Sequence, residues 1–209
     1  MRPLRIIEHI SLDGVIQAAG GPDEESEYPY GGWAAPYYDE AVGEGLDLAQ
    51  GDRFDLVLGR KTYDIFAGFW PKMSGPMADT LNAATKYVAT HRPDSLAWGP
   101  AQSLGGDISK GVADATAQDG PDLVVLGSST LTPFLLKAGL VDQVILLVFP
   151  VLLGSGKPFF SDIAKPCALE LVSSKSSPSG VLMSTYRPVG PLRTGNPGKD
   201  LADAKAAAV

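Results

Sequence analysis

The stretch FDLVLGRKTY, residues 54–63, decides the fold. It begins with Phe54–Gly59, a short apolar run that ends in glycine and is typical of a buried strand. Cations, a hydroxyl and an aromatic residue follow at once, where we expect a helix to begin. A helix N-terminus suits a phosphate because it carries unpaired backbone N–H groups and a partial positive charge. The stretch therefore predicts a strand-to-helix junction that binds an anion.

Two further strand ends carry glycine. Asp122–Gly127 runs directly into Ser128-Ser129-Thr130, and Val144–Pro150 is followed shortly by Gly154-Ser155-Gly156. The first of these is again a strand-to-helix junction, and two such junctions suggest one long anionic ligand, for which a dinucleotide is the natural candidate. The sequence has neither a G-x-G-x-x-G motif nor a phosphate-loop lysine motif, so a Rossmann or nucleotide-triphosphatase interpretation has no support.

Strands and helices are expected to alternate along most of the chain. Apolar patterns predict strands at 4–10, 54–59, 86–90, 122–126 and 143–149, and helices at about 38–51, 62–68, 76–83, 107–118 and 130–138. This alternation predicts an α/β fold with three layers, α/β/α, around a mainly parallel sheet. Two last strands at 168–175 and 180–187 are expected to form a C-terminal antiparallel hairpin.

The predicted strands and helices make up one domain, residues 1–188. Residues 189–209 are rich in Pro, Gly, Lys, Asp and Ala, and we expect a disordered tail there. Residues 17–36 contain many Gly, Pro, Glu and Tyr residues without periodicity, which is typical of a functional or mobile loop.

Composition excludes several classes of protein. The net charge of −7 argues against nucleic acid or an anionic membrane surface as the main partner. Cys167 is the only cysteine, so an internal disulfide and a thiolate-rich metal site are excluded, and two distant histidines predict no metal site. The N-terminal residues lack a signal-like apolar run, so we expect a cytoplasmic protein that acts on a small molecule.

Five segments in this order resemble the dihydrofolate reductase superfamily, and most of all the reductase domain of the bifunctional riboflavin-pathway deaminase/reductase. They are Ser11–Ile16, Gly59–Tyr63, Lys86–Arg92, Val125–Ser128 and Pro150–Gly156. The resemblance spans roughly 1–188 and implies a dihydrofolate-reductase-like fold. It also implies that NADPH lies across the carboxyl ends of the parallel strands.

The resemblance implies a role for each residue at these strand ends. Arg60 would face the 2′-phosphate of NADPH, where a guanidinium offers paired donors and a permanent charge. Lys61 would either join this grip or point into solvent, and Ile16 would border the nicotinamide. The other residues that the resemblance places at the cofactor are Gly59, Thr62, Thr90, His91, Arg92, Gly127, Ser128, Ser129 and Thr130.

On the substrate side, Asp39 is the candidate catalytic residue, because reduction of a C=N bond needs a proton as well as a hydride. Its alternative role is that of a solvated first-turn residue that favours the helix dipole. Phe66 is a candidate for the substrate pocket or for core packing. Trp33 is a candidate for the substrate pocket, as part of a lid beside the long loop. Gly154 and Gly156 either border the cleft or simply turn the chain. We interpret His9 as a hydrogen-bonded core residue.

These features predict an NADPH-dependent reductase that transfers a hydride to a small heterocyclic substrate. An alternative is 5-amino-6-(5-phosphoribosylamino)uracil reductase of riboflavin synthesis, but Val15 stands where those enzymes usually carry a lysine. A second alternative is a non-catalytic nucleotide-binding module. The resemblance also suggests a homodimer, and the apolar stretch 144–153 fits either a dimer contact or a buried central strand.

Overall fold

The computed structural model describes residues 1–160 and 166–196. These residues form strands β1 (Leu4–Ser11), β2 (Phe54–Gly59), β3 (Lys86–Ala89), β4 (Ala101–Ser103), β5 (Asp122–Leu126), β6 (Gln143–Phe149), β7 (Cys167–Ser176) and β8 (Leu182–Pro191). Their α-helices are α1 (Glu40–Gln50), α2 (Arg60–Phe69), α3 (Pro76–Ala83), α4 (Ile108–Ala117) and α5 (Leu131–Lys137).

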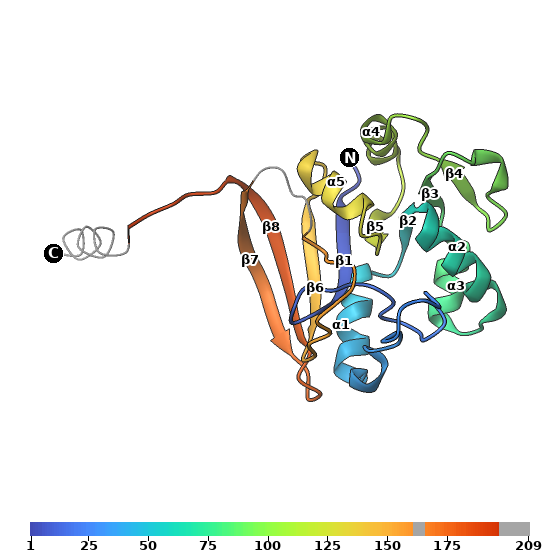
Figure 1. Cartoon of the computed structure of the whole chain (residues 1–209). Helices are drawn as coiled ribbons and strands as arrows, with labels where there is room; N and C mark the ends of the chain where they lie inside the picture. Colours follow the sequence, from blue (N-terminus) through green and yellow to red (C-terminus); the bar gives the residue numbers. More distant parts are fainter. Residues whose placement is uncertain (161–165, 197–209) are drawn as a thin grey trace.

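All eight described strands form one sheet, in the order β4-β3-β2-β5-β1-β6-β8-β7. The pairs from β4 to β6 are parallel, whereas β8 pairs antiparallel with both β6 and β7. Figure 1 shows the β7–β8 hairpin at one end of the sheet, away from α2 and α3. The predicted α/β fold with a mainly parallel sheet and a C-terminal hairpin is confirmed.

The helices divide between the two faces of the sheet according to the direction in which the chain crosses it. From β1 through β4 the chain moves toward one edge, and α1 to α3 pack on one face through Val42, Tyr63 and Leu81. From β4 to β6 it moves back, and α4 and α5 cover the other face through Val112 and Leu135. This division follows from the right-handedness of crossover connections between parallel strands.

The reversal of direction creates a switch point at β5. The chain leaves β5 over one face of the sheet, whereas it leaves the neighbouring strands β1 and β2 over the other face. The connections therefore separate beside the carboxyl end of β5, and ligands of open α/β sheets bind in crevices of this kind. The fold places the crevice beside Gly127, where the sequence predicts an anion-binding junction.

Two strands differ from the sequence prediction. β8 continues to Pro191, beyond the predicted end of the last strand at residue 187, and the antiparallel ladder extends as far as Cys167 opposite Pro191. β4 was not predicted because it has only three residues and no apolar run. Residues 197–209 of the predicted tail lie outside the described residues.

The long loop after β1 packs closely against the sheet. Residues 17–34 form turns but no helix or strand, as predicted, whereas Ala35 and Pro36, the last two residues of the predicted loop, begin a short 3-10 helix, Ala35–Tyr37. Tyr28 and Trp33 are buried within this loop, and the Trp33 indole N–H donates to the backbone oxygen of Gln17 over 2.8 Å. Among the helices of the described part of the chain, none is long and apolar enough to cross a membrane.

Candidate active site

A pocket of about 360 Å³ lies at the carboxyl ends of β2, β3 and β5. It is lined by Gly59, Arg60, Lys61, Ala89, Ile108, Ser128, Thr130, Leu131 and Phe134. We call it the strand-edge pocket. Five of the residues predicted to bind the cofactor line it, from two junctions far apart in the sequence, and apolar side chains of α4 and α5 complete it. The pocket thus joins two cations and two hydroxyl groups to an apolar wall.

Glycine at position 59 lets the two junctions approach each other. A Cβ atom on Gly59 would lie well inside 3.0 Å of Ser128 Oγ, a separation that real Cβ atoms do not show. No side chain caps the N-terminus of α2, which begins at Arg60, so its first backbone N–H groups stay available. These groups and the hydroxyls of Ser128 and Thr130 are the donors that a pyrophosphate requires.

The second junction has an unusual backbone. Gly127 has φ +69° and Ser128, although not a glycine, has φ +84°. Positive φ values outside glycine are uncommon and concentrate at functional sites. Thr62 lies beside this turn, since a Cβ on Gly127 would be 3.6 Å from its Oγ1. The structure therefore brings Thr62 next to Gly127, as a shared phosphate site requires.

Arg60 anchors a cluster of polar groups beside the pocket. Its guanidinium donates to Ser95 Oγ over 2.7 Å, to the backbone oxygen of Arg92 over 3.2 Å and to Thr90 Oγ1 over 3.5 Å. It also pairs with Asp64 at 2.8 Å, and this carboxylate raises the pKa of Arg60 above its ordinary value. Arg92 reaches the same carboxylate at 3.4 Å. Two guanidinium groups and hydroxyls thus gather around the single carboxylate of Asp64.

Lys61 is connected to the long loop. Its Nζ lies 2.8 Å from Glu25 Oε2, and the same oxygen lies 2.6 Å from Nζ of Lys157. Gln17 also donates to this carboxylate over 2.6 Å. Lys61 is exposed, as one of its two predicted positions required, but its ammonium group is paired with Glu25. Sequence analysis did not predict the contacts of Glu25 with Lys61 and Lys157, since these residues are distant along the chain.

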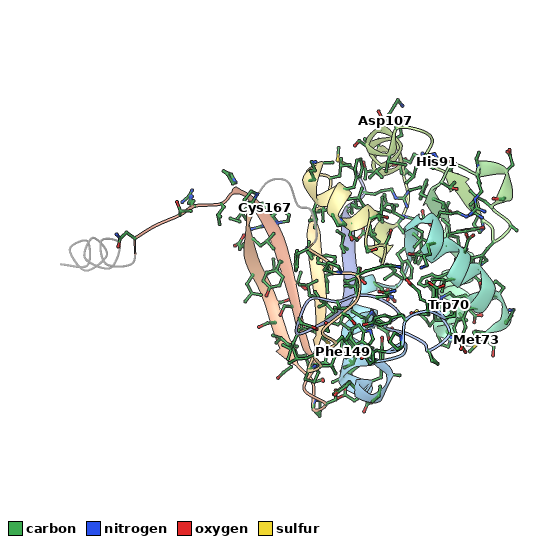
Figure 2. All side chains as sticks on the ribbon, in the orientation of Figure 1. Trp70, Met73, His91, Asp107, Phe149 and Cys167 are labelled. Atoms are coloured by element: carbon green, nitrogen blue, oxygen red, sulfur yellow. The ribbon has the colours of Figure 1, made fainter. Side chains whose placement is uncertain are left out.

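Seven predicted cofactor residues do not line the pocket: Thr62, Thr90, Arg92 and Gly127, described above, and Ile16, His91 and Ser129. His91 is exposed near the α4 side of the molecule (Figure 2), and Ser129 is half-buried. Ile16 is 9% exposed and belongs to the apolar cluster beneath α4 and α5, while its backbone N–H donates to Lys157 over 3.0 Å. Their roles at the cofactor stay predictions.

The four residues predicted for the substrate pocket pack against different parts of the protein. Trp33 makes an edge-to-face contact with Phe149, and Phe66 contacts Trp70 and Trp98, so both belong to or border the core. The Gly154 N–H donates to Asp13 over 2.6 Å. Gly156 has φ +132°, and a Cβ there would overlap Val15 and Tyr28. This geometry favours the packing and turn interpretations for these residues.

Asp39 is the N-cap of α1. One carboxylate oxygen accepts the N–H of Val42 and the other accepts the N–H of Ser179, each over 2.9 Å. These backbone hydrogen bonds, chiefly that of Val42, lower the pKa of Asp39 below its ordinary value. A proton donor at neutral pH needs a raised pKa, so the geometry favours the capping role, and the catalytic role stays a prediction.

A hydrogen-bonded pair beside Asp39 was not predicted. His9 Nε2 bonds to the hydroxyl of Tyr38, and both rings pack against Phe149, which lies beside α1 in Figure 2. Burial lowers the pKa of His9 to about 4 and raises that of Tyr38 to about 12, so both side chains are neutral at neutral pH. The hydrogen-bonded interpretation of His9 is correct, but its partner and its place at the carboxyl end of β1 were missed.

Comparison with known proteins identifies relatives of the whole domain. The family model described as RibD C-terminal domain matches residues 4–183. The uncharacterized protein YyaP of Bacillus subtilis (strain 168) is 28% identical over 183 residues, covering 85% of this chain and 90% of YyaP. The uncharacterized protein YwjB of the same organism is 27% identical over 182 residues, covering 85% of this chain and 94% of YwjB.

Solved structures share the fold at low sequence identity. A putative riboflavin biosynthesis protein from Shewanella sp. PV-4 has a TM-score of 0.63 and 22% identity, covering 90% of this chain and 99% of that one. A pyrimidine reductase-like protein from Corynebacterium diphtheriae has a TM-score of 0.57 and 15% identity, with coverages of 90% and 92%. Dihydrofolate reductase from Enterococcus faecalis, complexed with NADP(H), has a TM-score of 0.58 and 18% identity, with coverages of 89% and 96%.

Proposed function

Since the chain belongs to the RibD C-terminal domain family, we propose that it is an NADPH-dependent reductase that transfers a hydride to a small heterocyclic substrate. One observation carries this proposal. Gly59, Arg60, Lys61, Ser128 and Thr130 were selected from the sequence as cofactor residues, and all of them line a single pocket. That pocket lies at the carboxyl edge of the parallel strands, beside the switch point of the sheet.

The donor set of the pocket fits a phosphorylated dinucleotide. Arg60, with Thr90, Arg92 and Ser95 around it, would hold the 2′-phosphate through charge-assisted hydrogen bonds. The uncapped N-terminus of α2 and the hydroxyl of Ser128 would hold the pyrophosphate. Ile108 and Phe134 offer apolar surface to the adenine. When bound, NADPH supplies the hydride; the chain orients it and excludes water.

The substrate side of this proposal is the face of β1 that carries His9. We place the substrate beside Tyr38, a residue that is 45% exposed and whose hydroxyl bonds to His9. With the Nε2–H tautomer of His9, the imidazole donates to the phenol oxygen and leaves the Tyr38 proton available to the substrate. Because these groups and the surrounding aromatic rings are neutral, they suit a neutral planar ring better than a phosphate ester.

The test is a turnover screen at the absorbance band of reduced nicotinamide. Purified protein and NADPH are mixed with pterins, pyrimidines, quinones and the aminouracil ribosyl phosphate. We expect NADPH oxidation with a neutral heterocycle and slower oxidation in Tyr38→Phe. Turnover of the aminouracil phosphate would support the riboflavin role instead. Saturable NADPH binding without turnover of any acceptor would identify a non-catalytic binding module.

A further inference from the structure

Glu25, in the long loop after β1, connects that loop to the strand-edge pocket. Its Oε2 atom lies 2.8 Å from Nζ of Lys61 and 2.6 Å from Nζ of Lys157, and the Lys157 Nζ also lies 2.8 Å from Oε1. Gln17 donates to the same carboxylate over 2.6 Å. We call these four residues the Glu25 cluster. One of them, Lys61, also lines the pocket.

The two sides of the Lys61–Glu25 pair differ in how firmly they are held. The Glu25 side chain is 15% exposed, whereas that of Lys61 is 62% exposed. Burial raises the pKa of Glu25, but hydrogen bonds from Lys157, Lys61 and Gln17 outweigh burial, so the pKa lies below its ordinary value. Glu25 is therefore a fixed carboxylate at neutral pH. Lys61 ends in a flexible stem that can turn to another partner.

Glu25 keeps most of its partners if Lys61 turns away. Lys157 contacts both carboxylate oxygens, and Gln17 donates to one of them. Tyr28 also anchors the loop, since its hydroxyl donates to the backbone oxygen of Ser155 over 2.7 Å. Lys157 and Ser155 belong to the segment after β6, whereas Lys61 belongs to α2. Loss of the Lys61 contact would therefore separate the loop from this residue of α2 and leave its contacts with that segment in place.

We propose that Lys61 exchanges the carboxylate of Glu25 for a phosphate group when an anionic ligand occupies the strand-edge pocket, an inference that rests on the proposed function. Glu25 is then an internal competitor of the ligand, since it is an anion of the loop that binds the same cation. Occupation of the pocket weakens the attachment of the loop to α2. By thermodynamic reciprocity, this attachment weakens binding of the ligand by the same factor.

The chemistry of the two anions favours this exchange. An ion pair with an exposed lysine contributes little to stability, so the Lys61–Glu25 contact is easily broken. A phosphate group carries more negative charge than a carboxylate and has three acceptor oxygens. In the pocket it would also lie near Arg60 and the uncapped N-terminus of α2, which attract an anion together with Lys61.

The experiment measures the dissociation constants of NADPH and of inorganic pyrophosphate by calorimetry. It compares wild type with Glu25→Gln, Lys61→Met and the double variant. We expect Glu25→Gln to bind both ligands about two- to fivefold more tightly, because the charged competitor of the ligand has been removed. In the Lys61→Met background, Glu25→Gln should have no such effect, since the coupling passes through this lysine.

Glu27→Gln is the matched control for the loss of a negative charge. Glu27 lies in the same loop and is exposed, and in the described structure it acts on Lys61 through its charge without pairing with it. Its replacement should change either affinity less than Glu25→Gln does.

Hydrogen exchange of the backbone amides of residues 20–30 follows the loop directly. We expect pyrophosphate to accelerate this exchange in wild type and to leave it unchanged in Lys61→Met, where the contact is already absent.

Unchanged or weaker binding in Glu25→Gln would overturn the inference and leave the proposed function standing. Equal tightening in Glu27→Gln, or in the Lys61→Met background, would also overturn it. If wild type bound pyrophosphate but not NADPH, the proposed function would fail, while the pyrophosphate measurements would still decide whether Lys61 exchanges its partner. If wild type bound neither ligand, both proposals would fail.

Discussion

At the scale of single residues, Arg60 is the group that should distinguish NADPH from NADH. Its guanidinium is placed by Ser95 and Thr90 beside the strand-edge pocket. We expect Arg60→Ala to weaken NADPH binding about tenfold or more and to leave NADH binding nearly unchanged. The measurement is a fluorescence titration with each nucleotide.

Arg53→Ala is the matched control for this experiment. Arg53 is exposed and precedes β2, so it lies at the amino-terminal end of that strand, whereas the pocket lies at the carboxyl end. It should change neither affinity. Asp64→Asn should tighten NADPH binding, since it removes the carboxylate that now pairs with Arg60. A loss of NADH affinity equal to that of NADPH in Arg60→Ala would contradict the assignment of Arg60 to the 2′-phosphate.

Gly59 should be intolerant of even one additional carbon atom. In Gly59→Ala the new Cβ would overlap Ser128 Oγ, so one junction must shift. We expect a loss of about 1–3 kcal/mol in the free energy of unfolding and weaker NADPH binding. Urea denaturation and nucleotide titration measure the two effects.

Gly68→Ala is the control, because Gly68 lies in α2 with no atom within 4 Å of its added Cβ. It should stabilise the protein by up to about 1 kcal/mol, since alanine favours a helix over glycine. The double variant Gly59→Ala with Ser128→Gly should recover part of the loss. If Gly59→Ala had the same free energy of unfolding and the same affinity for NADPH as wild type, this prediction would be contradicted. The close approach of Gly59 to Ser128 would then matter neither for stability nor for binding.

At the scale of elements, Asp39 connects α1 to the turn between β7 and β8. Asp39→Ala should lower the thermal unfolding midpoint, because the N–H groups of Val42 and Ser179 lose their acceptors. Asp39→Asn keeps a capping oxygen and should fold better than the alanine variant. Once a substrate is found, normal turnover in Asp39→Asn would assign Asp39 to capping, whereas its loss with an unchanged midpoint would assign it to proton transfer.

The same residue gives a pH dependence. The pKa of Asp39 is lower in the folded protein than in the unfolded chain, so its contribution to stability is complete above about pH 4 and is lost as pH falls through the folded value. Denaturation curves at pH 6 and pH 3 should show that the free energy of unfolding decreases less on acidification in Asp39→Asn than in wild type. An equal loss in both proteins would exclude this carboxylate as a source of acid sensitivity.

Local sequence predicts most elements but not the contacts between them. The strand-to-helix junctions were predictable because glycine, hydroxyls and cations adjoin apolar runs. The Asp39–Ser179 and His9–Tyr38 contacts join residues far apart in the chain, and no periodicity indicates them. β4 was missed for a different reason: its three residues become a strand only by pairing with β3.

At the scale of the whole molecule, we propose that two copies associate through the exposed hairpin at the end of the sheet (Figure 1). β7 is an edge strand whose Leu171 and Val172 are 53% and 52% exposed. An edge strand has backbone N–H and C=O groups without partners in the sheet. The same strand of a second copy, related by a twofold axis, can form hydrogen bonds with these groups. Sedimentation of wild type should give a dimer, and Leu171→Asp should give a monomer.

Met73→Asp is the control for charge on an exposed apolar residue, since Met73 is 46% exposed and lies on the opposite side of the molecule from the hairpin (Figure 2). It should leave the dimer intact. A monomeric wild type at high micromolar concentration would contradict the proposal, and so would a dimer that survives Leu171→Asp.

The central claim is that the strand-edge pocket binds a phosphorylated nicotinamide dinucleotide. Isothermal titration calorimetry of the wild-type protein with NADPH tests it most directly. We predict saturable heat with a single site per chain, competition by adenosine 2′,5′-bisphosphate and weaker binding of NADH. The absence of saturable heat from NADPH at millimolar concentration would contradict the account.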